Sequence, residues 1–117
     1  MKRKHLGNKG EQIACTYLVK KDFEIVEKNY YSQYGEIDII AKKDEQLHFV
    51  EVKTRQNLEG VILGELLTNK QKASLNKTIS VYVGKLDKID ISYQLDLLVI
   101  LFKKKVNKAK VYFYEGV

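Results

Sequence analysis

Two stretches in which apolar and polar residues alternate, Gly35–Ala41 and Phe49–Arg55, constrain the fold more than any other feature of the sequence. Successive side chains of a strand point to opposite faces, so each stretch predicts a strand with one apolar face. Asp44 and Glu45 lie between the two stretches, at the position of a tight turn. The sequence therefore predicts an antiparallel hairpin whose isoleucines and valines face one core.

The alternation also predicts how the two strands pair. A slip by one residue would turn the apolar side chains of one strand away from those of the other, so the pattern favours a single register. With Asp44 and Glu45 at the tip, the predicted opposed pairs are Ile39 with Val50, Ile37 with Val52, Ile40 with Phe49, Glu36 with Lys53, and Asp38 with Glu51.

The pairing of Asp38 with Glu51 is unusual because like charges on opposed strand residues, with Cβ atoms about 4.5–5.5 Å apart, are destabilising. Two carboxylates this close share a proton, take up a cation or splay apart into water. Mg²⁺ binds through one or two carboxylates and keeps positions for water and phosphate oxygens. Lys53 would stand about 6–7 Å along the strand from Glu51. The hairpin fits a metal site that meets a phosphodiester; the alternative is a solvent-facing side with incidental acids and Lys53 paired to Glu36 or Glu51.

The other segments predict two helices and three more strands. Asn8 and Glu11 have the spacing of a capping box, which predicts a helix over about 8–21, and Thr68 and Gln71 predict a second helix over 68–85. Strands are expected over 23–31, 90–104 and 108–115, the second of them buried on both faces and the last at an edge. The order helix, three strands, helix, two strands predicts a mixed sheet flanked by helices, in the α/β class.

Composition narrows the class of protein. With 117 residues, 44% of them hydrophobic and 31% charged, the chain is expected to form one globular domain, 1–117. No apolar run approaches the roughly 18 residues needed to cross a bilayer, and the first residues lack the apolar segment of a signal peptide. The single cysteine, Cys15, cannot form an internal disulfide, so we expect a cytoplasmic protein with no membrane contact. The net charge of +6 favours a polyanionic partner, nucleic acid above all.

Three motifs in this order and spacing carry a resemblance to a known family: Gly10–Ala14 (GEQIA), Gly35–Ala41 (GEIDIIA) and Phe49–Arg55 (FVEVKTR). Together they resemble the YraN family, small bacterial proteins regarded as endonuclease-like. The resemblance extends from about Lys9 to Asp96. It implies a restriction-endonuclease-like fold, also similar to that of archaeal Holliday-junction resolvases: a central mixed β-sheet flanked by helices in the order α-β-β-β-α-β-β.

The resemblance also implies a catalytic site. Asp38 and Glu51 match the acids that hold the metal, which would be Mg²⁺ or Mn²⁺. Lys53 matches the lysine that orients or activates the attacking water, or stabilises the charge that builds on the phosphate. Glu11 matches a further acid that helps to bind metal, with helix capping as its alternative role. The backbone carbonyl of Val52 is a further expected metal ligand.

Other residues are candidates for contacts with nucleic acid: Arg55, Lys70 and Tyr31. Lys70 falls where the family carries a basic residue, with a solvated lysine as the alternative. Tyr31 stands where arginine is expected; with Tyr30 and Tyr34 it would either stack on unpaired bases or pack under the first helix. Asp96 matches an acid common in the family, but within an apolar strand it is expected to accept structural hydrogen bonds.

Two functions follow, and a third reading, a scaffold without nucleic-acid function, has to treat the opposed carboxylates as an accident. The first is a Mg²⁺- or Mn²⁺-dependent endonuclease that acts on branched or single-stranded DNA in repair, recombination or DNA processing. The alternative is a nucleic-acid-binding module on a nuclease fold, with weak or partner-dependent activity, because likeness of fold does not establish activity. Resolvase-like relatives act as two-fold dimers, so a homodimer is expected by analogy.

Overall fold

The computed structural model describes the backbone of residues 2–62, 65–87 and 90–117, and the side chains of residues 9–62, 65–87, 90–103 and 105–117. The predicted order of elements and the α/β class are confirmed. The elements are α1 (Lys2–Lys20), β1 (Glu24–Ser32), β2 (Gly35–Lys43), β3 (Gln46–Arg55), α2 (Asn69–Gly84), β4 (Ser92–Lys103), a 3-10 turn η2 (Lys104–Val106) and β5 (Lys108–Tyr114).

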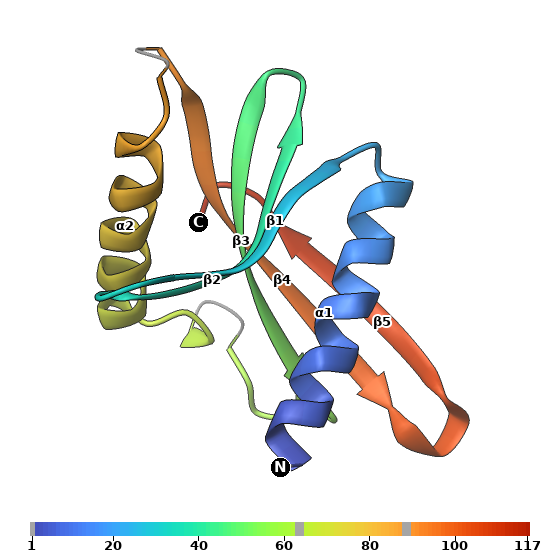
Figure 1. Ribbon diagram of the computed structural model, residues 1–117. Helices are drawn as coiled ribbons and strands as arrows, with labels where there is room; N and C mark the ends of the chain where they lie inside the picture. Colours follow the sequence, from blue (N-terminus) through green and yellow to red (C-terminus); the bar gives the residue numbers. More distant parts are fainter. Residues whose placement is uncertain (1, 63–64, 88–89) are drawn as a thin grey trace.

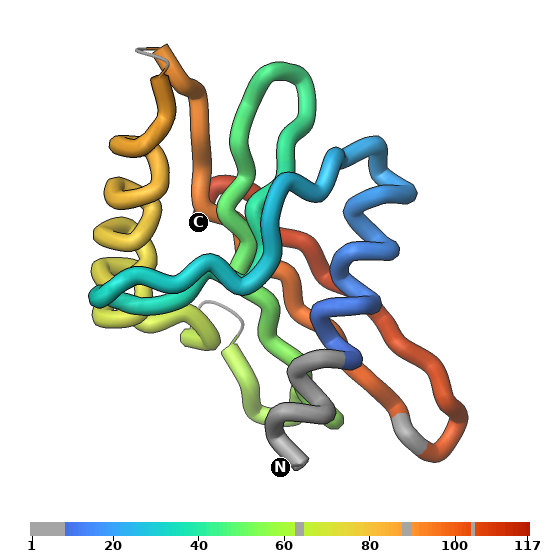
Figure 2. Tube along the Cα trace, viewed as in Figure 1, coloured from blue at the N-terminus to red at the C-terminus, as the bar shows by residue number. Residues whose placement is uncertain are grey.

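The strands form a five-stranded mixed sheet in the order β1-β2-β3-β4-β5 (Figure 1). Only β3 and β4 run parallel, and the other neighbours are antiparallel. A parallel pair needs a crossover connection, and the segment that contains α2 supplies it. In Figures 1 and 2, α1 and α2 lie on opposite sides of the sheet. The arrangement is consistent with the restriction-endonuclease-like fold.

Each helix covers its own apolar cluster. The cluster beneath α1 includes Ala14, Leu18, Ile39, Val50, Leu98 and Ile100. The cluster beneath α2 includes Ile37, Ile40, Phe49, Leu75, Ile79, Leu97 and Val99. Strand β4 contributes to both clusters, so it is buried on both faces, as the sequence predicts, and β5 lies at the edge.

The predicted start of the first helix is wrong. The helix begins at Lys2, so Asn8 lies inside it and is not its N-cap. Glu11 therefore has no capping role, because capping groups belong to the first turn of a helix. The capping box of α2 is confirmed: Thr68 Oγ1 accepts from the Gln71 backbone N–H at 3.1 Å, and Gln71 Oε1 accepts from the Thr68 N–H at 3.0 Å.

The hairpin of β2 and β3 has the predicted turn and, near it, the predicted register. Asp44 and Glu45 have φ angles of 51° and 63°, as a two-residue type I′ turn requires. The two confirmed pairs are Ile39 with Val50 and Ile40 with Phe49.

Beyond Ile39 the predicted pairing is wrong. The β2–β3 ladder stops there, so three predicted pairs do not form: Asp38 with Glu51, Ile37 with Val52, and Glu36 with Lys53. The first half of β2 pairs only with β1, and this β1–β2 hairpin bends toward α2 (Figure 2). Asn29, beside the bend, has a left-handed φ of 54°. Ile37 consequently packs in the α2 cluster and does not share the face of Ile39.

Contacts with α2 hold the bent hairpin in place. Ser32 Oγ at its tip lies 2.9 Å from Thr78 Oγ1. The ring of Tyr30 packs edge-on against Tyr82, with 5.1 Å between the centroids. These contacts hold the β1–β2 hairpin against α2. The first half of β2 therefore lies away from β3, and the opening between β2 and β3 starts at Asp38.

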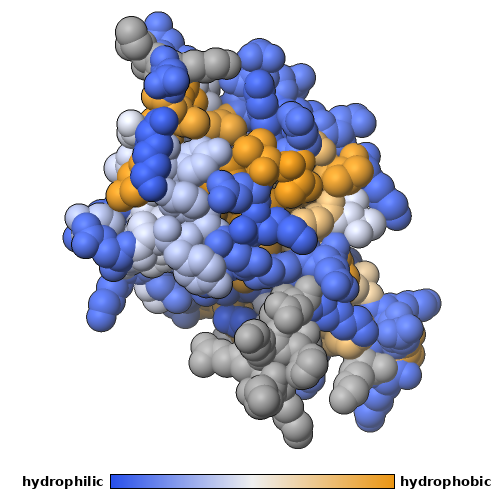
Figure 3. All heavy atoms as spheres, in the orientation of Figure 1, coloured by the Kyte–Doolittle hydropathy of each residue, from blue (hydrophilic) through white to orange (hydrophobic). Residues whose placement is uncertain are grey.

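Polar side chains dominate the surface around the projecting hairpin. In Figure 3 hydrophilic and weakly polar residues cover it, and strongly hydrophobic residues gather in a band above it. No helix in the described ranges has the length and apolar character needed to cross a membrane.

Candidate active site

Asp38 lies where β2 separates from β3. Its Oδ2 accepts a hydrogen bond from the backbone N–H of Val52 at 2.8 Å, in place of a strand-to-strand bond. The N–H and C=O of one strand residue point toward the same neighbouring strand. The Val52 carbonyl therefore faces the opening as well, which is where a ligand to the predicted metal needs to be.

Glu51 and Lys53 project from β3 into the same region. Lys53 Nζ lies 3.4 Å from Glu51 Oε2, and the two side chains are only 17% and 15% exposed. Glu51 also lines a cleft of about 240 Å³ between the β1–β2 hairpin and the start of α2, together with Glu36 and Lys70. The predicted trio of Asp38, Glu51 and Lys53 thus converges, although its members are not paired across a ladder.

A negative charge on Asp38 is disfavoured in this environment. Burial, followed by the hydrogen bond and the charge of Glu51, raises the pKa of Asp38 to about 8. The N–H of Val52 and the charge of Lys53 act in the opposite direction but are weaker. A protonated Asp38, or a cation beside it, is therefore favoured over the bare anion.

Glu11 and Glu36 bring two further carboxylates. Glu11 comes from α1 and Glu36 from β2, and each offers an oxygen within 4.8 Å of the other and of Asp38. Burial first, and then the charge of Asp38, raises the pKa of both glutamates. Glu36 thus lies among the acids around Asp38, and the strand pairing with Lys53 that the sequence predicts does not form.

Asn29 links two of these acids, which was not predicted from the sequence. With its amide nitrogen turned toward them, it donates to Glu11 Oε1 at 3.0 Å and to Glu36 Oε1 at 2.9 Å. The signal available in the sequence is weak: asparagine is one of the few residues that adopt a positive φ readily, and here it stands inside a strand.

The three candidates for nucleic-acid contact lie in different surroundings. Lys70 lines the cleft beside Glu36, at the start of α2. Tyr31 is opposite Glu36 on β1 and is 69% exposed, and the Glu36 carboxylate raises the pKa of its hydroxyl. Arg55 ends β3 and donates to the Thr54 carbonyl at 2.9 Å; within the described residues it makes no ion pair with the acids of the site.

The structure also bears on the roles expected for the tyrosines near the hairpin and for Asp96. Tyr30 packs on α2, so packing under the first helix is wrong for it, while Tyr34 is 43% exposed. Asp96 lies fully buried outside this cluster and accepts hydrogen bonds from Gln94 and from the Gly116 backbone, which confirms its structural role.

The chain matches one protein family over a range that includes every residue of the candidate site. Residues 10–100 match the family model described as "Uncharacterised protein family UPF0102". A UPF0102 protein of Campylobacter lari is 52% identical over 95 residues, covering 80% of this chain and 81% of the relative. One from Campylobacter fetus is 47% identical over 105 residues (89% and 87%), and one from Helicobacter hepaticus is 40% identical over 100 residues (86% and 87%). The chain therefore belongs to UPF0102, the YraN family.

Proposed function

We propose that this protein is a Mg²⁺- or Mn²⁺-dependent endonuclease that hydrolyses phosphodiester bonds in branched or single-stranded DNA. The observation that carries the proposal is the convergence of Asp38, Glu51 and Lys53, with the pKa of Asp38 raised to about 8. Perturbed acids grouped in a cleft are characteristic of functional sites. A divalent cation would remove the repulsion that these carboxylates otherwise face.

The available ligands suit a hard cation. Asp38, Glu51 and Glu11 offer carboxylate oxygens, and the Val52 carbonyl faces the same opening. Oxygen ligands with room for water are the set that Mg²⁺ and Mn²⁺ take. When bound, such an ion would supply Lewis-acid polarisation of the phosphate and a lowered pKa of water.

Among the residues of the site, Lys53 is the one suited to act on the reacting phosphate. Its contact with Glu51 fixes the ammonium beside the acids while other N–H bonds stay available. A preorganised cation stabilises the charge that builds on the phosphate oxygens in the transition state, and such groups are worth about 10²–10³ in rate.

Lys70 would hold the substrate in the cleft. It lines the α2 wall, and Glu51 is among the residues that line the same cleft. A phosphate of the DNA backbone that enters the cleft would meet the Lys70 ammonium on its way to Lys53. The net charge of +6 supports the same class of partner at long range.

A cleavage assay tests the proposal. Labelled single-stranded, duplex, flap and four-way DNA would be incubated with the protein and Mg²⁺, Mn²⁺ or EDTA. We expect metal-dependent cutting that Glu51→Gln and Lys53→Met each reduce by at least about 100-fold. Glu45→Gln is the matched control, because Glu45 lies at the β2–β3 turn with an 85% exposed side chain.

Wild-type protein that cuts none of these DNAs with either metal would contradict the proposal. Salt-sensitive binding that is equal in wild type, Glu51→Gln and Lys53→Met, again without cutting, would leave the nucleic-acid-binding module as the function.

A further inference from the structure

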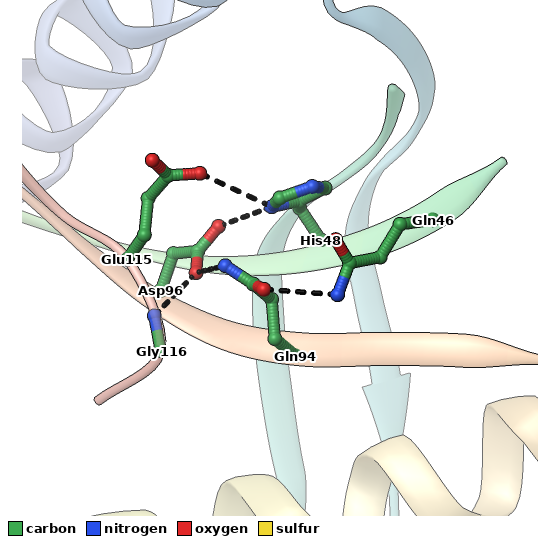
Figure 4. Close-up of polar contacts among 6 residues, drawn as sticks. All are labelled: Gln46, His48, Gln94, Asp96, Glu115 and Gly116. Atoms are coloured by element: carbon green, nitrogen blue, oxygen red, sulfur yellow. Dashed lines mark hydrogen bonds and ion pairs between the residues drawn. The ribbon is translucent and has the colours of Figure 1, made fainter. Parts of the chain in front are cut away.

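A second polar cluster lies at the other end of β3 (Figure 4). His48 of β3 and Asp96 of β4 are buried, with 4% and 0% of their surface exposed, and Glu115 directly follows β5. His48 is three residues from Glu51 along the strand, so the two side chains point to opposite faces. The cluster is therefore separate from the candidate active site.

Two carboxylates face one nitrogen of the His48 ring. Nδ1 lies 2.6 Å from Asp96 Oδ2 and 4.0 Å from Glu115 Oε1, as the dashed lines in Figure 4 show. A single N–H makes one well-aligned hydrogen bond, and Asp96 takes it. Across the described residues Glu115 forms no ion pair with lysine or arginine. The hydrogen bond between His48 and Asp96 does not explain why the Glu115 carboxylate lies 4.0 Å from the same ring nitrogen.

The surroundings hold Asp96 and His48 in fixed orientations. Asp96 Oδ1 accepts from Gln94 Nε2 at 2.6 Å and from the Gly116 N–H at 2.9 Å. Gln94 in turn accepts from Gln46 Nε2 at 2.9 Å. The His48 ring packs edge-on against Phe23, with 4.8 Å between the centroids. Outer hydrogen bonds of this kind orient the ligands of metal sites, and here they direct Asp96 Oδ2 toward Nδ1.

We propose that His48, Asp96 and Glu115 bind a zinc ion, which fastens the C-terminal segment to β3 and β4. An imidazole nitrogen with two carboxylate oxygens is a set that Zn²⁺ takes, at about 2.0–2.2 Å, with water in the fourth position, whereas Mg²⁺ prefers oxygen alone. In a tetrahedral site the ligand atoms stand about 3.4 Å apart. The present separations of 2.6 and 4.0 Å lie on either side of that value, so each changes by less than about 1 Å.

Nδ1 must be free of its proton to bind zinc. The neutral ring then carries its proton on Nε2, and the contact with Asp96 changes from a hydrogen bond to shared coordination. Glu115, whose side chain is 57% exposed, is the ligand that moves most easily. Its movement onto zinc would add a tie between β3, β4 and the chain beyond β5.

Nitrogen NMR tests the site at the histidine itself. The chain has two histidines, so His5→Gln leaves His48 as the only imidazole. In this protein, an equimolar amount of Zn²⁺ should move the ¹⁵N signal of His48 Nδ1 to the metal-bound range, and Mg²⁺ should not. Glu115→Gln, at a position with a 57% exposed side chain, should weaken zinc binding by at least about tenfold, and Glu45→Gln should not.

An unchanged His48 signal with equimolar zinc would overturn the proposal. Equal zinc affinity in Glu115→Gln and Glu45→Gln would overturn it too. The measurement uses no DNA and no residue of the candidate active site, so its outcome is independent of the endonuclease proposal.

Discussion

Asp38 is poorly accommodated as an anion in the folded chain. Its pKa rises from 3.8 to about 8, first because it is buried and then because Glu51 lies beside it. An acid with a higher pKa in the folded than in the unfolded state favours folding while it is protonated. That contribution is lost as the pH rises through the interval between the two values, from about 4 to about 8.

Asp38→Asn should therefore remove a pH-dependent loss of stability. The asparagine oxygen can still accept from the Val52 N–H, but it carries no charge. We expect calorimetry in EDTA to give a Tm at pH 8 that is higher in the variant by at least about 4 °C, with no difference near pH 4. A variant that is less stable than wild type at pH 8 would show that the anion is not disfavoured.

At the scale of residues, the sequence predicted that Asp38, Glu51 and Lys53 lie in one region, but on the basis of a strand pairing of Asp38 with Glu51 that does not form. It was not sufficient for Glu36 and Asn29. Their approach to Glu11 depends on the bend of the β1–β2 hairpin, and a pattern of alternating residues does not encode a bend.

Among the elements, α1 delivers Glu11 to the site because it lies very close to β3. A Cβ added at Gly10 would stand 2.1 Å from Thr54 Oγ1, so only hydrogen fits there. The next residue of the helix is Glu11, which reaches Asp38. The glycine of the GEQIA motif thus sets the distance between helix and site.

Gly10→Ala should destabilise the protein by about 1–3 kcal/mol, as overpacking does in a close-packed contact. It should also weaken Mn²⁺ binding, because the helix that carries Glu11 is pushed outward. Thr54→Ala removes the clashing oxygen, so the double variant should recover most of the lost stability in denaturant titrations.

Gly84→Ala is the control for this pair, because an added Cβ there meets nothing within 4 Å. It should leave stability unchanged or raise it by up to about 1 kcal/mol. Additive effects of Gly10→Ala and Thr54→Ala, with no recovery, would contradict the close contact.

The first turn of α2 lines the cleft, and in the proposed function its Lys70 holds the DNA. Lys70→Ala should weaken binding to single-stranded DNA in EDTA and reduce the slope of log affinity against log salt by about one. Lys72→Ala is the control, because Lys72 stands on the same helix but does not line the cleft. Fluorescence anisotropy across a salt series measures both; equal effects of the two substitutions would remove Lys70 from the interface.

At the scale of the whole molecule, local signals predicted most of the fold. The Thr68–Gln71 capping box, the two-residue turn and the apolar run of β4 each specify an element without help from distant residues. The bend of the β1–β2 hairpin depends instead on contacts such as that of Ser32 with Thr78, which are 46 residues apart in the sequence. Contacts at that separation leave no local pattern to read.

We also expect two chains on each DNA molecule. A single chain of 117 residues offers little surface to a branched substrate, and most soluble oligomers are symmetric dimers. Light scattering of Glu51→Gln with four-way DNA should give a complex that contains twice the mass of the chain. A monomer with and without DNA would exclude the dimer.

The most direct test of the candidate active site is a calorimetric titration of Mn²⁺ at pH 8 into wild type, Glu51→Gln and Glu45→Gln. The grouping of Asp38 with Glu51 predicts binding heat in wild type and Glu45→Gln, and its loss in Glu51→Gln. Absence of heat in wild type, or the same binding curve for all three proteins, would contradict a cation site at these carboxylates.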